Sequence, residues 1–140
     1  MRYWDASAIL PLLTQEETTE RRRGQLEEDP RIITWWGSRV ECASALSRLF
    51  REGDLEIEVF EQLLSVLDTL ASGWVEIQPT QRLRQRAMRL LRLHPLRAAD
   101  ALQLAAAMIG AGEDPPTLPF VSGDPRLNDA ARNEGFPLLL

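Results

Sequence analysis

Short apolar segments alternate with longer segments of helical periodicity along the whole chain, and this alternation restricts the possible folds more than any other feature. Runs of β-branched and aromatic residues predict strands, and apolar residues three and four positions apart predict the helices between them. Strands that alternate with helices pack as a layered α/β domain with a mainly parallel sheet. The length of 140 residues suits a single domain.

We expect five strands, at residues 2–5, 32–35, 74–77, 118–121 and 136–140. The expected helices cover residues 7–13, 16–28, 38–51, 55–71, 80–94, 98–110 and 125–134, and residues 112–116 form a loop. Ser7, Asp54 and Asp124 stand where helix N-caps are expected, and Gly73 stands where a C-cap glycine is expected. No apolar run approaches the roughly 20 residues that span a membrane, and the N-terminus does not read as a secretory signal.

The inventory of reactive side chains excludes several kinds of chemistry. The chain has one histidine, His94, one cysteine, Cys42, and no lysine. A structural zinc site, a disulfide framework, a Schiff base and a phosphate-binding lysine loop are therefore all excluded. The single cysteine favours a reducing compartment, the cytoplasm. Carboxylates that hold a hard metal ion remain as the means of catalysis.

The charge is unevenly distributed along the sequence. The net charge is −5, yet the segment from Thr80 to Ala99 holds six arginines and no acid. One interpretation is a solvated helix face whose arginine stems cover apolar surface. The other is a surface that follows the phosphates of a nucleic acid, and the two are compatible. These arginines are Arg82, Arg84, Arg86, Arg89, Arg92 and Arg97.

Four acids occupy positions that suit a shared site. Asp5 and Asp124 follow the first and fourth predicted strands, and Glu41 and Asp100 lie near the starts of two helices. Ligands of parallel sheets bind at the carboxyl ends of the strands. Clustered carboxylates repel one another unless a cation lies among them, and Mg²⁺ or Mn²⁺ suits oxygen ligands. Such an ion supports hydrolysis of phosphoesters without histidine, lysine or cysteine.

Three of these acids also have a purely structural interpretation. Asp124 before Pro125 is an ordinary N-cap, and Asp100 and Glu41 are favourable charges at the starts of helices. Asp100 is the most informative, because it interrupts the most apolar helix of the chain and needs a polar partner if it is buried.

Taken together, four stretches of the sequence resemble the PIN-domain ribonucleases, in particular the VapC-type toxins of toxin–antitoxin modules. Their order and spacing cover essentially the whole chain, so residues 1–140 are expected to form one PIN domain. The matching stretches are YWDASAIL at 3–10, SRVECASAL at 38–46, LRAADALQLAAA at 96–107 and FVSGDPRL at 120–127, followed by Ala130-Ala131 and Gly135-Phe136.

The resemblance implies a three-layer α/β/α fold with a five-stranded, mainly parallel sheet of strand order 3-2-1-4-5. It implies that Asp5, Glu41, Asp100 and Asp124 bind Mg²⁺ or Mn²⁺ in a metal-dependent endoribonuclease. Ser7 and Ser122 fall where the family often has a hydroxyl that orients the acids. The sequence reads Ser122-Gly123-Asp124 where the family often has Thr-x-Asp, so the hydroxyl is kept but the glycine is expected to loosen the turn. Asp124 is therefore expected to complete the site either directly or through water.

The resemblance also implies partners. The RNA backbone would be guided by Arg82, Arg86, Arg89 and Arg97. A cognate VapB-type antitoxin would wrap the toxin and offer a basic side chain to the acidic pocket, in keeping with the net charge of −5. Homodimers are usual in the family. The apolar stripe of the helix at 55–71 and the polar helix at 16–28 are candidate contact surfaces, although the stripe is better explained as core.

Three competing functions have distinct signatures. A PIN-like interaction module with little catalytic activity would keep the fold, but it has no need of four acids. A phosphatase or a phosphoacceptor domain built on Asp5 would want a second acid two residues later, where Ser7 stands, or a lysine. A non-catalytic acidic domain that binds a protein partner would scatter its acids over the surface.

Overall fold

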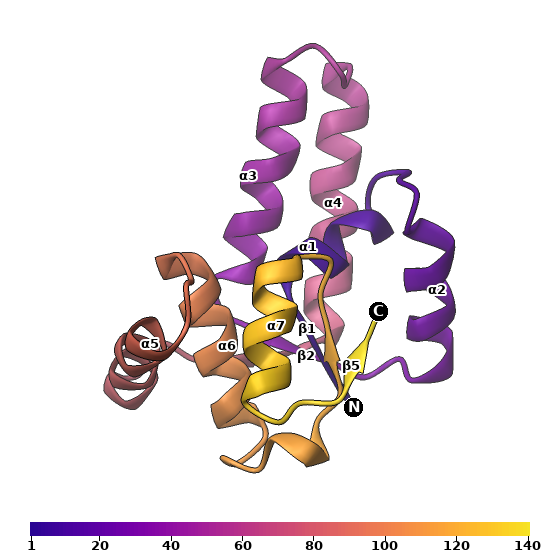
Figure 1. Ribbon diagram of the computed structural model, residues 1–140. Helices are drawn as coiled ribbons and strands as arrows, with labels where there is room; N and C mark the ends of the chain where they lie inside the picture. The colour runs from indigo at the N-terminus through magenta and orange to yellow at the C-terminus, as the bar shows by residue number, and fades with distance from the viewer.

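A five-stranded, wholly parallel sheet forms the centre of the computed structural model, which describes residues 1–140 (Figure 1). Its strand order is β3-β2-β1-β4-β5, which confirms the expected order and places β1 directly beside β4. The strands are β1 (Arg2–Trp4), β2 (Ile32–Trp35), β3 (Val75–Ile77), β4 (Phe120–Val121) and β5 (Leu138–Leu139).

Helices connect the strands and cover both faces of the sheet. None of them combines the length and the apolar character needed to cross a membrane. The helices are α1 (Ala6–Ile9), α2 (Thr19–Glu28), α3 (Ser38–Arg51), α4 (Ile57–Gly73), α5 (Gln81–Leu93), α6 (Ala98–Gly110) and α7 (Pro125–Asn133). Two 3₁₀ turns, at Leu10–Leu12 and Pro115–Thr117, complete the chain, and the second takes up part of the expected loop at 112–116.

Neighbouring residues of a strand pack into two separate cores, because successive side chains of a strand point to opposite faces of the sheet. Tyr3 and Phe120 face the core formed with α5, α6 and α7, where their rings stack with centroids 5.2 Å apart. Trp4 and Val121 face the core formed with α1, α3 and α4. The two cores and the sheet between them make the three-layer α/β/α architecture that the sequence predicts.

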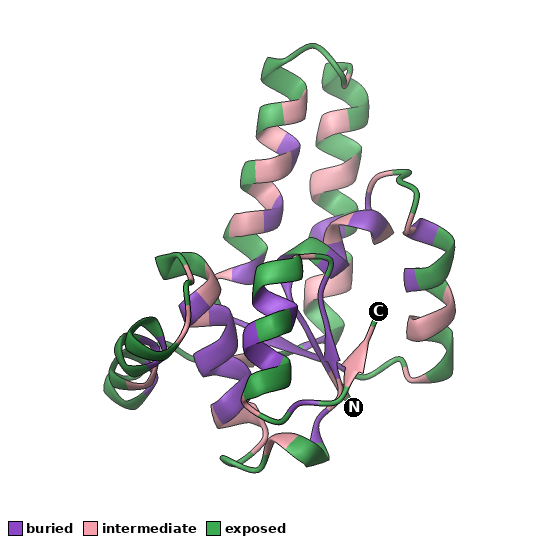
Figure 2. Cartoon of the chain, in the orientation of Figure 1, coloured by how far each residue is buried: buried purple, intermediate pink, exposed green.

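Helix α6 is the most deeply buried helix, with seven buried residues between Ala101 and Met108 (Figure 2). The hairpin of α3 and α4 differs, since it extends beyond the sheet and its outer turns are mostly exposed (Figures 1 and 2). In α4 only Leu67 is fully buried, and the rings of Phe50 and Phe60 stack 4.8 Å apart near the tip. The apolar stripe of α4 nevertheless packs on the core, because Phe60, Leu63, Leu64 and Leu70 lie against it beside Leu67.

Several boundaries differ from those expected, each for a local reason. Asp5, rather than Ser7, is the N-cap of α1, and its carboxylate accepts a hydrogen bond from the Ser7 N–H. Asp54 is not the cap of α4, because its N–H closes the end of α3 by donating to the Leu49 carbonyl at 2.9 Å; α4 begins after Glu56. Gly73 is the last helical residue of α4, without the left-handed conformation of a C-cap glycine. Helix α2 starts at 19, and β4 and β5 are shorter than expected.

Candidate active site

Two parallel strands end side by side at the start of the site. Trp4, the last residue of β1, is in register with Val121, the last residue of β4. The next residue after β1 is Asp5, whose N–H donates to the Val121 carbonyl at 3.0 Å. Asp5 is only 4% exposed. The topology therefore puts a buried carboxylate at the carboxyl end of the central strand, where parallel sheets bind ligands.

Two serine hydroxyls hold one oxygen of this carboxylate. Ser122 Oγ donates to Asp5 Oδ2 at 2.9 Å, and the Ser7 hydroxyl and N–H donate to the same oxygen. The two hydroxyl oxygens lie 3.2 Å apart. No protein group donates to Asp5 Oδ1, so that oxygen is available to a ligand.

The same serines also shape the loop after β4. The Gly123 N–H donates to Ser7 Oγ at 2.9 Å, and the Asp124 N–H donates to Ser122 Oγ at 3.0 Å. The glycine does not leave this turn loose, because both flanking amides are fixed by hydrogen bonds. Ser7 and Ser122 thus link Asp5 to the segment that carries Asp124.

Asp124 is both the N-cap of α7 and a residue that lines the site. Its Oδ1 caps α7 by accepting from the N–H groups of Arg126 and Leu127 at 2.9 and 3.4 Å. The side chain also lines a hollow of about 530 Å³, the α7 hollow, together with Asp100. Capping therefore uses one carboxylate oxygen, and it does not remove Asp124 from the site.

Glu41 is held by a buried amide that the sequence analysis did not single out. Gln103 Nε2 donates to Glu41 Oε1 at 3.1 Å and to Ser38 Oγ at 3.0 Å. Gln103 Oε1 in turn accepts from the Tyr3 hydroxyl at 2.5 Å. Gln103 follows Asp100 by one helical turn of α6 and is 1% exposed. The reasoning that singled out Asp100, a polar residue in an apolar helix, identifies Gln103 equally well.

The acids are close enough to affect one another's ionisation. Burial raises the pKa of Asp5, and the charge of Asp100 raises it further, against the serine hydrogen bonds that lower it. Burial and the charge of Asp5 raise the pKa of Glu41 to about 7. Burial, followed by the charge of Asp124, raises the pKa of Asp100. The four acids therefore form one electrostatically coupled group at this end of the sheet.

The four acids suit a divalent ion that keeps several of its waters better than an ion whose ligands all come from the protein. No three Asp, Glu, His or Cys side chains are placed so that all of them could hold one metal ion. Mg²⁺, however, keeps several of its waters and takes one or two carboxylates directly. Asp5 Oδ1 has no protein donor, and the mutual repulsion of the acids is relieved by a cation. The donor chemistry therefore suits a hard divalent cation.

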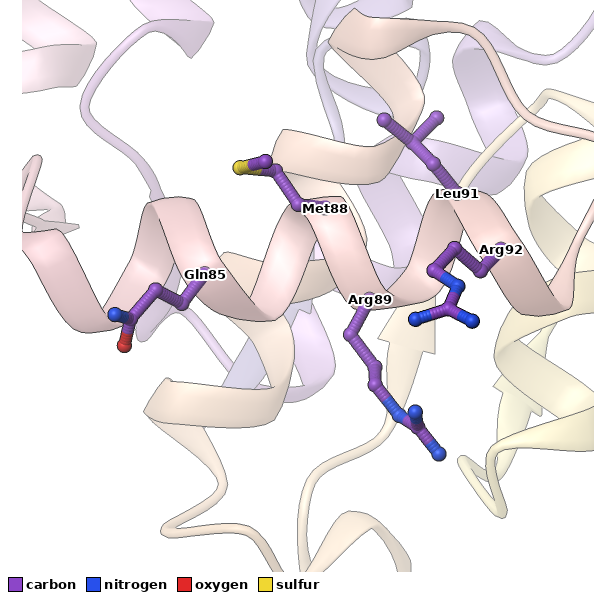
Figure 3. Close-up of a pocket in the computed structure, with 5 residues that line it drawn as sticks. All are labelled: Gln85, Met88, Arg89, Leu91 and Arg92. Carbon is purple, nitrogen blue, oxygen red and sulfur yellow. The ribbon is translucent and has the colours of Figure 1, made fainter.

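The four arginines expected to contact RNA lie in different environments. Arg97 is the N-cap residue of α6 and lines the α7 hollow beside Asp100. Arg82 and Arg86 lie 3.6 and 3.2 Å from the Glu113 carboxylate. Arg89 lines a separate hollow on α5 that contains no acid (Figure 3). Only Arg97 is therefore brought next to the acids.

A buried arginine, Arg22, is hydrogen-bonded to the segment that follows β4. It is 2% exposed, whereas its neighbours Arg21 and Arg23 are exposed. Its guanidinium donates to the Ser122 carbonyl at 3.3 Å, to the Leu139 carbonyl at 3.4 Å and to Gln25 Oε1 at 2.9 Å. Burial lowers the pKa of Arg22, and the charge of Asp5 raises it. Nothing in a run of three arginines marks the middle one as buried, so the sequence analysis missed this residue.

The raised pKa values predict how stability depends on pH. In EDTA, we expect stability to fall as the pH rises from 4.5, the ordinary pKa of a glutamate, towards 7, because folded Glu41 binds its proton more tightly than unfolded Glu41. The raised pKa values of Asp5 and Asp100 act in the same direction. Urea unfolding at a series of pH values measures this slope. It should be shallower for Glu41→Gln, and equal slopes would contradict the assignment.

Removing the buried guanidinium should loosen the link between α2 and the loop after β4. We expect Arg22→Gln to lower the free energy of unfolding by roughly 2 kcal/mol, because hydrogen bonds from a charged group are lost in the interior. Arg21→Gln, one residue away on the exposed face, should change it by less than about 0.5 kcal/mol. Denaturant unfolding checks both values, and amide exchange at Gly123 should accelerate only in the Arg22 variant. Similar behaviour of the two variants would argue against a supporting role.

Comparisons with known proteins agree with this architecture. The family model described as the PIN domain matches residues 2–133, a range that contains all four acids. Among solved structures, the crystal structure of FitAcB from Neisseria gonorrhoeae matches with a TM-score of 0.70 and 15% sequence identity, over 100% of this chain and 97% of that chain. At this identity the likeness concerns the fold alone. A comparison with curated proteins found no match. Because the family model spans nearly the whole sequence, the chain belongs to the PIN-domain family.

Proposed function

We propose that this chain is a Mg²⁺- or Mn²⁺-dependent endoribonuclease that acts in the cytoplasm as the VapC-type toxin of a type II toxin–antitoxin pair. The observation that carries the proposal is the electrostatic coupling of Asp5, Glu41, Asp100 and Asp124, which come from four separate segments of a PIN domain. The pKa values of Asp5, Glu41 and Asp100 are raised, and acids perturbed in this way mark a candidate functional site.

The proposed mechanism assigns a role to each residue of the site. Asp5, through Oδ1, and Asp100 would hold the ion, and Glu41 and Asp124 would act directly or through water. A bound divalent ion lowers the pKa of water and neutralises charge on a phosphate. Ser7 and Ser122 keep Asp5 oriented, and Gln103 keeps Glu41 oriented. Arg97, in the hollow beside Asp100, would bind a phosphate oxygen of the RNA.

The proposal includes two protein partners. A cognate VapB-type antitoxin with a basic segment would complement the net charge of −5 and the acidic site. A second copy of the chain is the other partner. Helix α4 offers apolar contact surface to either of them, since Ile57, Val59 and Val66 are each 42% exposed. The alternative function is a weakly catalytic interaction module, which would bind the same partners without cleaving RNA efficiently.

Removing one acid should abolish cleavage without unfolding the chain. We expect Asp100→Asn and Asp5→Asn to slow RNA cleavage in Mg²⁺ by more than about 100-fold, because even the outer partners of metal ligands contribute 10- to 100-fold. EDTA should stop the parent enzyme. Asp129→Asn is the matched control, because Asp129 is exposed on α7 and pairs only with Arg132.

The measurement is cleavage of end-labelled RNA followed by mapping of the new ends, with growth arrest on expression as the cellular readout. Growth arrest by an Asp5→Ala variant as strong as that of the parent would favour the interaction module. Folded Asp5→Asn or Asp100→Asn protein that cuts at the parent rate would refute the assignment.

Asp124 allows its structural role to be separated from its role in the site. Asparagine caps a helix about as well as aspartate, so Asp124→Asn should keep the stability of α7. We expect the same variant to cut RNA at least about 10-fold more slowly, because the site loses one negative charge. Thermal unfolding and cleavage rates measured on one preparation test both expectations. Unchanged cleavage would leave Asp124 with its capping role alone.

A further inference from the structure

Two hollows meet at the start of α6, where Arg97 and Ala99 line both of them. One is the α7 hollow. The other, the α3 hollow, has a volume of about 750 Å³ and runs along one face of α3 beside Glu41. Its remaining α3 residues include Ser44, Ala45, Arg48 and Arg51. Glu41 in one hollow and Asp100 and Asp124 in the other therefore line a surface depression that continues in two directions.

Cationic side chains line both outer parts of this depression. Arg48 and Arg51 line the α3 hollow beyond Glu41, and Arg126 lines the α7 hollow beyond Asp100. None of these arginines forms an ion pair within the chain. The charges of Arg97 and Arg126 lower the pKa of Asp100, so both lie near the acids. The pattern is a negative centre between two positive flanks.

Arg48 and Arg51 lie at increasing distances from Glu41 along α3. Arg48 follows Glu41 by seven residues, a rise of roughly 10 Å along the helix axis. Arg51 is three residues further, on the same face as Arg48. An RNA strand carries a negative phosphate at every nucleotide, so a divalent ion at the acids together with the flanking arginines would give it a continuous row of cations.

The arginines of α5 are less suited to this task. Arg82 and Arg86 are engaged by Glu113. Arg89 and Arg92 border a hollow with Gln85, Met88 and Leu91, which shares no residue with the two hollows at the acids (Figure 3). A phosphate bound there would not be continuous with the acidic centre.

We propose that the RNA backbone crosses the two hollows, with phosphates bound by Arg48 and Arg51 on one side of the scissile phosphate and by Arg126 on the other. This inference rests on the proposed function and deepens it by naming the substrate contacts. The substrate is a single strand. Asp5 is buried, while Glu41 and Asp100 line the hollows, so the scissile phosphate must enter past them, and a flexible strand can bend in this way.

Binding measured without cleavage tests the inference directly. The probe is a fluorescein-labelled single-stranded RNA of mixed sequence, titrated with full-length protein in EDTA over a series of salt concentrations. We expect Arg48→Gln/Arg51→Gln to weaken binding about 10-fold or more. The slope of log K against log salt should fall by about 1.4, the value for two phosphate contacts with a single strand.

The matched control is Arg84→Gln/Arg92→Gln, which removes two exposed arginines from α5. It should bind RNA within about twofold of the parent, and both double variants should unfold at the parent temperature. Equal losses in the two variants, or a loss only in the α5 variant, would overturn the inference. If the parent cuts RNA and the Arg48/Arg51 variant binds it normally, only this inference fails. If the parent neither binds nor cuts RNA, the proposed function fails with it.

Discussion

The carboxylate of Asp5, buried at the junction of β1 and β4, is the group on which the organisation of the site depends. A buried charge is costly unless it is hydrogen-bonded and compensated. Ser7 and Ser122 supply the hydrogen bonds, and Arg22 supplies a positive charge that is bound to the Ser122 carbonyl. The same serines fix the amides of Gly123 and Asp124. Satisfying one carboxylate therefore also positions the loop that carries another.

A second network positions Glu41 from the opposite side. Gln103 connects the Tyr3 hydroxyl in β1 with Ser38 and Glu41 in α3. Tyr3 also stacks on Phe120 of β4, so the core and the site share a residue. An amide suits this place because it donates to Glu41 and accepts from the Tyr3 hydroxyl at the same time. The site is thus built into the packing between the sheet and α6.

Much of the fold could be predicted from the sequence, because strands and helices differ in their apolar period at every element from Tyr3 to Ala131. The strand order and the meeting of β1 with β4 followed from the resemblance to the PIN family, and the structure confirms them. The burial of Arg22 and the ion pairs of Arg82 and Arg86 could not be predicted, since they depend on which helix packs where. Composition marked α5 as the cationic element, but the arginines that line the hollows with the acids come from α3, from α7 and from the N-cap of α6.

The central position of β1 has a consequence for synthesis of the chain. Asp5 is synthesised long before Ser122, and the hydrogen bond between them joins groups 117 positions apart. The neighbouring strand β4 and the capping turn of α7 likewise belong to the last fifth of the sequence. A nascent chain that has not reached Phe120 lacks β4, Asp124 and α7. Contacts between such distant segments also form slowly. The group of acids around Asp5 is therefore assembled late, after the segment that carries Ser122 and Asp124 has been synthesised and has packed beside β1.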